Sequence, residues 1–94
     1  MNCTVKIYSE NSEELFSFLE KFFSTKLTLN NISYWEKDYQ NPIEIADIVA
    51  AFIDNKTNYP TSNMWVSLDK GAFINIKSDN YNSFIKYLFE RYPY

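Results

Sequence analysis

Carboxylates are the side chains in this sequence whose spacing is best suited to chemistry. From Glu36 to Asp54 the chain holds five acidic residues and one basic residue, Lys37, which gives this stretch a local charge of −4. Two neighbouring carboxylates can act as a general acid and base when their pKa values are separated, but Glu44 is already explained by helix capping. The stretch is most simply a solvated helix face and loop; the functional interpretation is an acidic surface that steers a basic protein partner. The residues expected to contact that partner are Trp35, Glu36, Asp38, Glu44 and Asp47. A core position is the alternative for Trp35, because a tryptophan in an extended segment is more often buried than not.

Other residue types that carry chemistry are scarce. The chain has no histidine, which removes the commonest general base near neutral pH and every Ser–His or Cys–His pair. One cysteine cannot build a zinc site, which takes four Cys or His ligands in most structural cases. The single glycine, Gly71, does not provide a Gly-rich phosphate loop or a dinucleotide-binding fingerprint. We therefore expect a protein that is not an enzyme and has neither a metal site nor a cofactor.

Charge and cysteine usage bear on the compartment and on the kind of partner. Nine Lys and Arg residues against twelve Asp and Glu residues argue against nucleic-acid binding and against a membrane surface. We expect Lys6, Lys77 and Lys86 to be scattered, solvated lysines. Cys3 has no cysteine to pair with and is expected to be a small buried hydrophobe. Without a signal peptide or an apolar run of about 20 residues, the sequence favours a cytoplasmic protein.

The 94 residues fall within the size of one domain, 1–94. Alternating apolar residues predict a strand over 3–8, and apolar spacing after Asn11 predicts a helix to about Ser24. Residues 26–39 are expected to be extended, either as a hairpin with a turn at Asn30-Asn31 or as one strand with a bulge. Asn41-Pro42-Ile43-Glu44 predicts a helix start that is capped by the asparagine, and this helix should end near 54–55. A third helix is expected from Ser78 or Asp79 to Pro93.

Residues 64–77 are expected to form a β-hairpin whose turn follows from side-chain phase. A three-residue loop, Asp69-Lys70-Gly71, pairs Leu68 with Ala72, Val66 with Ile74 and Met64 with Ile76, so that all the aliphatic residues share one face. Gly71 then takes the left-handed position that closes the loop. The predicted fold class is α+β, a mostly antiparallel sheet of four or five strands with three helices in the order β-α-β(β)-α-β-β-α. This order is similar to that of ferredoxin-like folds, a similarity that carries no functional information.

The same phase places Trp65 and Phe73 on the opposite face of the sheet, joined by Tyr8 if the first strand lies beside them. These three residues are expected either to form an interface, including a homodimer interface, or to be covered as a second small core. The leading hypothesis for function is a non-enzymatic protein-binding module, in its most concrete form a bacterial immunity or inhibitor protein that masks a basic partner. The alternatives are a homodimeric structural or regulatory protein and a small-molecule sensor.

Overall fold

The computed structural model describes residues 2–9, 12–24, 26–29, 32–69 and 71–92. Its eight elements have the predicted α+β composition and order, with three helices and five strands. No helix in these ranges is long and apolar enough to cross a membrane. The elements are β1 (Cys3–Ser9), α1 (Ser12–Leu19), β2 (Lys26–Leu29), β3 (Ile32–Tyr39), α2 (Pro42–Asn55), β4 (Asn63–Leu68), β5 (Ile74–Ile76) and α3 (Tyr81–Arg91).

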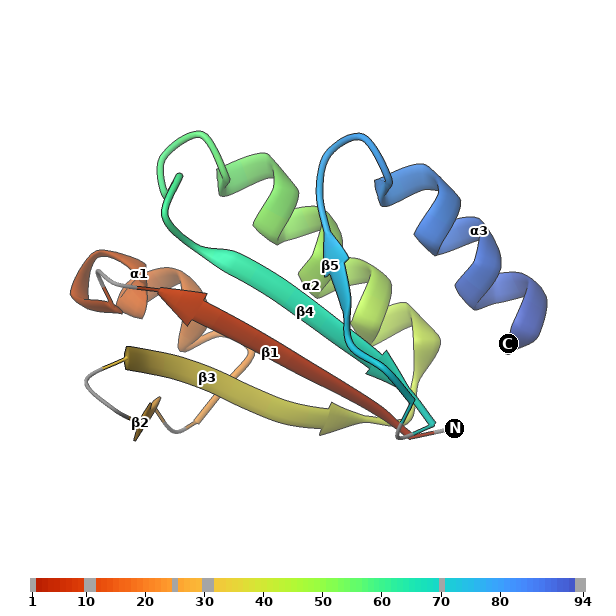
Figure 1. Cartoon of the computed structure of the whole chain (residues 1–94), viewed down its shortest axis with the longest axis horizontal. Helices are drawn as coiled ribbons and strands as arrows, with labels where there is room; N and C mark the ends of the chain where they lie inside the picture. Colours follow the sequence, from red (N-terminus) through yellow and green to blue (C-terminus); the bar gives the residue numbers. More distant parts are fainter. Residues whose placement is uncertain (1, 10–11, 25, 30–31, 70, 93–94) are drawn as a thin grey trace.

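The strands form one sheet in the order β2-β3-β1-β4-β5 (Figure 1). Every neighbouring pair is antiparallel, and β1 lies at the centre between β3 and β4. The first six elements therefore have the connections and strand order of a ferredoxin-like βαββαβ unit. β5 and α3 extend this unit beyond β4.

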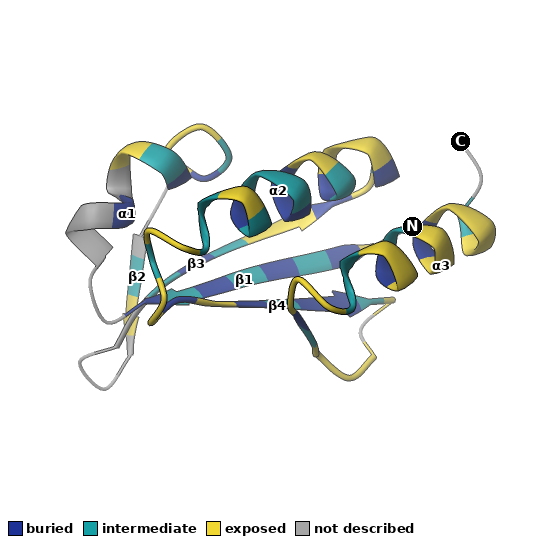
Figure 2. Ribbon diagram, turned by 90° about the horizontal axis from the view of Figure 1, so that it is seen from above, coloured by how far each residue is buried: buried dark blue, intermediate teal, exposed yellow. Residues whose placement is uncertain are grey.

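All three helices lie on the same face of the sheet (Figure 2). Burial along β1 alternates residue by residue, and Cys3, Val5 and Ile7 are fully buried on the helical side. This alternation is expected when one face of an antiparallel sheet carries the core and the other does not. The side chains that meet β1 from α2 are Ile45, Ile48, Val49 and Phe52, all buried in one core cluster.

The strongest local signal in the sequence is confirmed at the start of α2. The helix begins at Pro42, and the Ile43 N–H donates to Asn41 Oδ1 at 2.9 Å. Proline at the first helical position costs no hydrogen bond, since that N–H has no partner inside the helix. The helix ends at Asn55, as its apolar periodicity predicts.

The predicted register of the β4–β5 hairpin is confirmed, whereas its turn differs from the prediction. Met64 pairs with Ile76 and Val66 with Ile74, but the ladder ends there, so the Leu68–Ala72 pair is not formed. The residue with positive φ is Asp69, at 52°, and not Gly71. Aspartate tolerates this region because its short polar side chain bonds locally. Gly71 is needed instead for close approach, because a Cβ there would lie 3.0 Å from the carbonyl oxygen of Leu68.

The first half of the chain shows where local periodicity fails. α1 ends at Leu19, earlier than predicted, and Phe23 leaves the helical path to become buried with its ring 6.2 Å from that of Trp35. Leu29 pairs antiparallel with Ile32, which confirms the hairpin alternative. The predicted turn residues Asn30-Asn31 and the predicted cap Asn11 lie outside the described residues.

The start of α3 is also displaced, from Ser78 or Asp79 to Tyr81. Asn80 holds the preceding turn: its Oδ1 accepts from the Lys77 N–H at 2.7 Å, and its Nδ2 donates to the Asn75 carbonyl at 2.9 Å. These side-chain bonds compete with helix formation, so the helix begins after them. The predicted stop at Pro93 lies outside the described residues.

Candidate functional site

The face of the sheet that the helices leave uncovered, hereafter the open face, carries a compact set of polar and aromatic side chains. Residues directly opposite each other in an antiparallel ladder point to the same side of the sheet. The open-face side chains of β1 therefore lie in line with those of its two neighbours, in three rows across the strands. The rows are Ser67–Thr4–Asp38, then Asn75–Trp65–Lys6–Glu36, then Asn63–Tyr8–Tyr34–Leu27.

Lys6 lies in the middle row and links both sides of the open face. Its Nζ is 3.7 Å from Glu36 Oε1 on β3 and 4.7 Å from the ring centroid of Phe73, which precedes β5. The Lys6 side chain is only 24% exposed, so part of its hydration is replaced by a carboxylate and an aromatic face. The prediction that Lys6 is a solvated lysine is therefore wrong.

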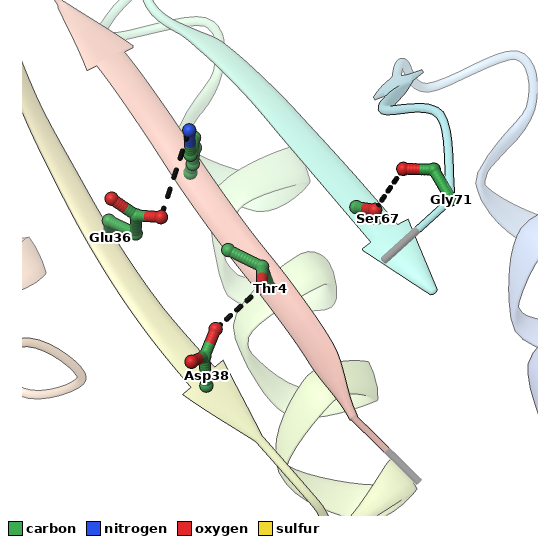
Figure 3. Close-up of polar contacts among 6 residues, drawn as sticks. Thr4, Glu36, Asp38, Ser67 and Gly71 are labelled. Atoms are coloured by element: carbon green, nitrogen blue, oxygen red, sulfur yellow. Dashed lines mark hydrogen bonds and ion pairs between the residues drawn. The ribbon is translucent and has the colours of Figure 1, made fainter. Parts of the chain in front are cut away.

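The second carboxylate of the open face is also held by a partner on β1. Thr4 Oγ1 donates a hydrogen bond to Asp38 Oδ1, and Figure 3 shows the two side chains meeting between the strands, with Glu36 further along β3. At the other side of the row, Ser67 Oγ donates to the Gly71 carbonyl and anchors the β4–β5 turn (Figure 3). Glu36 and Asp38 thus each have a partner on β1.

Aromatic rings occupy the remaining positions along the open face. The rings of Tyr8 and Tyr34 stack with centroids 5.4 Å apart. Trp65 is half-buried, and Phe73 is 41% exposed. The predicted placement of Tyr8, Trp65 and Phe73 on one sheet face agrees with the register, and none of the described segments forms a second layer over it (Figure 2).

The predicted acidic region does not form one patch. Glu36 and Asp38 point to the open face, whereas Lys37, between them, pairs with the buried Val5 and lies on the helical side. Glu44 and Asp47 also lie on the helical side, so the acids that are close in sequence act on two opposite surfaces. The prediction that one partner contacts all these acids is therefore corrected: alternation along β3 turns Glu36 and Asp38 to the open face, whereas α2 lies on the other side of the sheet.

Glu44 and Asp47 line a hollow of about 190 Å³ between the end of α1, β3 and the start of α2. Lys21 and Lys37 line the same hollow, so its charges are mixed. Tyr39 forms part of its wall, donating its hydroxyl to the Phe22 carbonyl at 3.2 Å. Burial, with the negative charge of Glu44 nearby, raises the pKa of Tyr39 to about 12. The two positive and two negative charges offset one another, so the hollow is a poor candidate for the site that binds a basic partner.

Trp35 is not a surface anchor. It is 1% exposed, pairs with Ile7 on the helical side and packs against Phe23. A partner would have to open the core to reach it, so the prediction that Trp35 contacts a partner is corrected. Sequence reasoning missed Thr4, Lys6 and Tyr34 as members of the open face. Alternation along β1 identifies Thr4 and Lys6, and alternation along β3 identifies Tyr34 once Trp35 is placed in the core.

The open face combines large, partly buried rings with the Lys6–Glu36 ion pair and the carboxylate of Asp38, which accepts a hydrogen bond from Thr4. Among the described residues, no three side chains of the types His, Cys, Asp or Glu come together to hold a metal ion. Comparison with protein-family models, curated proteins and solved structures gave no match, so a function for this surface has to be argued from its own geometry.

Proposed function

We propose that the protein is a non-enzymatic protein-binding module that contacts its partner through the open face. The observation that carries the proposal is the one-sided packing of the sheet, in which helices cover one face only (Figure 2). The other face presents the rings of Tyr8, Tyr34, Trp65 and Phe73 around the Lys6–Glu36 ion pair. An antiparallel sheet face that stays in water normally carries polar residues. Tyrosine and tryptophan are favoured interface anchors because they bury a large area at low entropy cost.

The charge of the open face favours a partner with a basic rim. Lys6 neutralises Glu36, and Asp38 remains as a negative charge beside them. Complementary charge at the rim of an interface raises the rate of association. The finer form of the proposal is an immunity or inhibitor protein that masks a basic surface of its partner. Only Glu36 and Asp38 of the acidic region would take part.

A matched pair of charge reversals tests this assignment. Photo-crosslinking from position 34 in native cells first identifies the partner. Glu36→Lys with Asp38→Lys is then expected to weaken its binding on the order of tenfold or more, since like charges now face the basic rim. Glu44→Lys with Asp47→Lys changes the net charge equally but lies on the helical side, so binding should stay within about twofold. Calorimetry of the three proteins with the purified partner gives the affinities.

Two results would contradict the proposal. Equal losses in both double variants would show that total charge, and not the open face, governs binding. Crosslinking from position 54, on α2, in place of position 34 would move the interface to the helices.

A homodimer through the same face is the second candidate, because the open face carries charges of both signs. A two-fold copy can place Lys6 opposite the partner's carboxylates while the rings of Trp65 and Phe73 pack together, as a self-complementary interface requires. Sedimentation of the wild type at tens of micromolar should then show a dimer, and Trp65→Ala should give a monomer because it removes the largest ring of the interface. A monomeric wild type rules out the homodimer and leaves the open face for a different protein.

A further inference from the structure

A second pocket, of about 250 Å³, lies at one end of the sheet, away from the charge-mixed hollow. It is formed by the connections from α2 to β4 and from β5 to α3, which lie at the same end of the molecule in Figure 1. None of the described residues that line it is acidic, although acids outnumber bases in the chain as a whole. The polar residues that line this pocket are Lys56, Lys77, Ser62, Ser78, Asn63 and Asn75.

Ser62 supplies an independent sign that this pocket receives a ligand. Its relative exposure is 0%, and its Oγ has no hydrogen-bond partner among the described residues. Leaving a buried hydroxyl unpaired is unfavourable, and native proteins seldom tolerate it without a bound water, ion or ligand. Ser62 is among the residues that line the pocket, and a hydroxyl is able to donate to an oxyanion.

Lys56 is held in place at the pocket and retains donor capacity. Its Nζ donates to the Pro60 carbonyl at 3.1 Å and to the Tyr59 carbonyl at 3.4 Å. An ammonium group has three donors, so these two bonds leave one for a ligand. Burial lowers the pKa of Lys56, and an anion beside it would favour the charged form.

The opposite wall of the pocket is fixed by Asn80. This residue accepts from the backbone N–H of Lys77 and donates to the carbonyl of Asn75, which holds the segment that carries Lys77 and Ser78. The second lysine is therefore presented from an ordered turn. Side chains positioned before a ligand arrives lose little entropy on binding.

We infer that this pocket binds the phosphate group of a small molecule. A phosphate monoester carries a charge of about −1.5 to −2 near neutral pH, which the two ammonium groups of Lys56 and Lys77 match. The hydroxyls of Ser62 and Ser78 and the amide of Asn63 are donors that suit its oxygens, whereas the amide of Asn75 donates to the Met64 carbonyl. Such a site does not need a glycine-rich loop, because side chains provide the donors. Asn63 and Asn75 also stand at the ends of two open-face rows, but the inference does not rest on the function proposed for that face.

Thermal unfolding and calorimetry with defined anions test the inference. Inorganic phosphate is expected to raise the melting temperature in a saturable manner, while sodium chloride at the same ionic strength is not. Succinate, a dianion without phosphate geometry, should bind more weakly. Tighter binding of a nucleoside monophosphate than of inorganic phosphate would identify a phosphate ester as the ligand, and the reverse order would identify the free ion. Equal effects of phosphate and chloride, or of phosphate and succinate, would overturn the phosphate assignment.

A matched pair of lysine substitutions locates the site. Lys77→Gln is expected to weaken phosphate binding on the order of tenfold, since it removes one of two charge-assisted donors. Lys86→Gln removes the same charge from the exposed face of α3, where its Nζ lies 4.0 Å from Glu90, and should leave the affinity within about twofold. Equal losses in the two variants would mean that phosphate senses only the net charge, which would overturn the site.

Ser62→Ala tests whether the hydroxyl serves a ligand or the fold, because the two roles predict opposite changes in stability without phosphate. In phosphate-free buffer the variant should be as stable as the wild type or more stable, because it removes an unpaired buried hydroxyl. In phosphate its gain in melting temperature should be smaller than that of the wild type. A variant that is less stable without phosphate and gains the full shift with phosphate would show that Ser62 serves the fold alone, and the inference would fail.

Discussion

Replacing Trp35 with alanine is expected to lower the free energy of unfolding by about 3–5 kcal/mol. The indole is 1% exposed and lies between Ile7 of the neighbouring strand and the ring of Phe23, so its loss leaves a cavity in the core. Small domains are stable by only about 5–15 kcal/mol. The loss is therefore a large share of the stability that such a domain has. Urea unfolding followed by circular dichroism measures the difference.

Trp65→Ala is the control for this substitution, because it removes the same side chain from the open face. Trp65 is half-buried and lies between Lys6 and Asn75 in the ladder. We expect a cost of about 1 kcal/mol, typical of a substitution outside the core. A cost as large as that of Trp35→Ala would contradict the free surface on which the proposed interface depends.

The sequence predicts those parts of the fold that depend on local chemistry. The Asn41-Pro42 start of α2 is confirmed because capping involves only neighbouring residues. The pairing of Val66 with Ile74 is confirmed because only one register brings the aliphatic residues of the hairpin to one face. Both signals are complete within a few residues, so no distant contact is needed to interpret them.

The predictions that failed depend on contacts made elsewhere in the chain. The periodicity after Leu19 is helical, but Phe23 is buried against Trp35, which the sequence does not place beside it. The only glycine of the hairpin was the obvious candidate for positive φ, yet Asp69 takes that conformation while its N–H donates to the Asn2 carbonyl. In both cases a tertiary contact outweighs the local preference.

The sequence predicts only some of the residues of the open face, for the same reason. Tyr8, Trp65 and Phe73 follow from strand alternation alone. The separation of Glu36 and Asp38 from Glu44 and Asp47 depends on which residues of 32–39 face the helices. The sequence leaves the register of 26–39 open, so it does not give this phase. Because Trp35 is in the core, strand alternation places Glu36 and Asp38 on the open face. The local charge of −4 gives no indication of this placement.

Raising the pH from 9 to 12 is expected to destabilise the protein through two buried acids. Burial, aided by the charges of Asp69 and Asp38, raises the pKa of the Cys3 thiol from 9.0 to about 12. Burial and the charge of Glu44 raise the pKa of the Tyr39 hydroxyl from 10.0 to about 12. Each group stays protonated in the folded protein over a range where the unfolded chain loses its proton. Their contributions are complete below pH 9 and are lost as the pH rises toward 12.

The size of this loss follows from the two pKa differences, on the order of 4 kcal/mol for Cys3 and 3 kcal/mol for Tyr39. Urea unfolding at pH 8, 9, 10 and 11 should show stability falling first through the thiol and then also through the phenol. Cys3→Ala removes the first contribution and Tyr39→Phe the second while keeping the ring, so each variant should lose less stability over this range than the wild type. An unchanged pH dependence in Cys3→Ala would mean that the thiol titrates alike in both states.

A deeply buried Cys3 should also react with thiol reagents at pH 8 about a thousandfold more slowly in the folded protein than in urea, because only the thiolate is reactive.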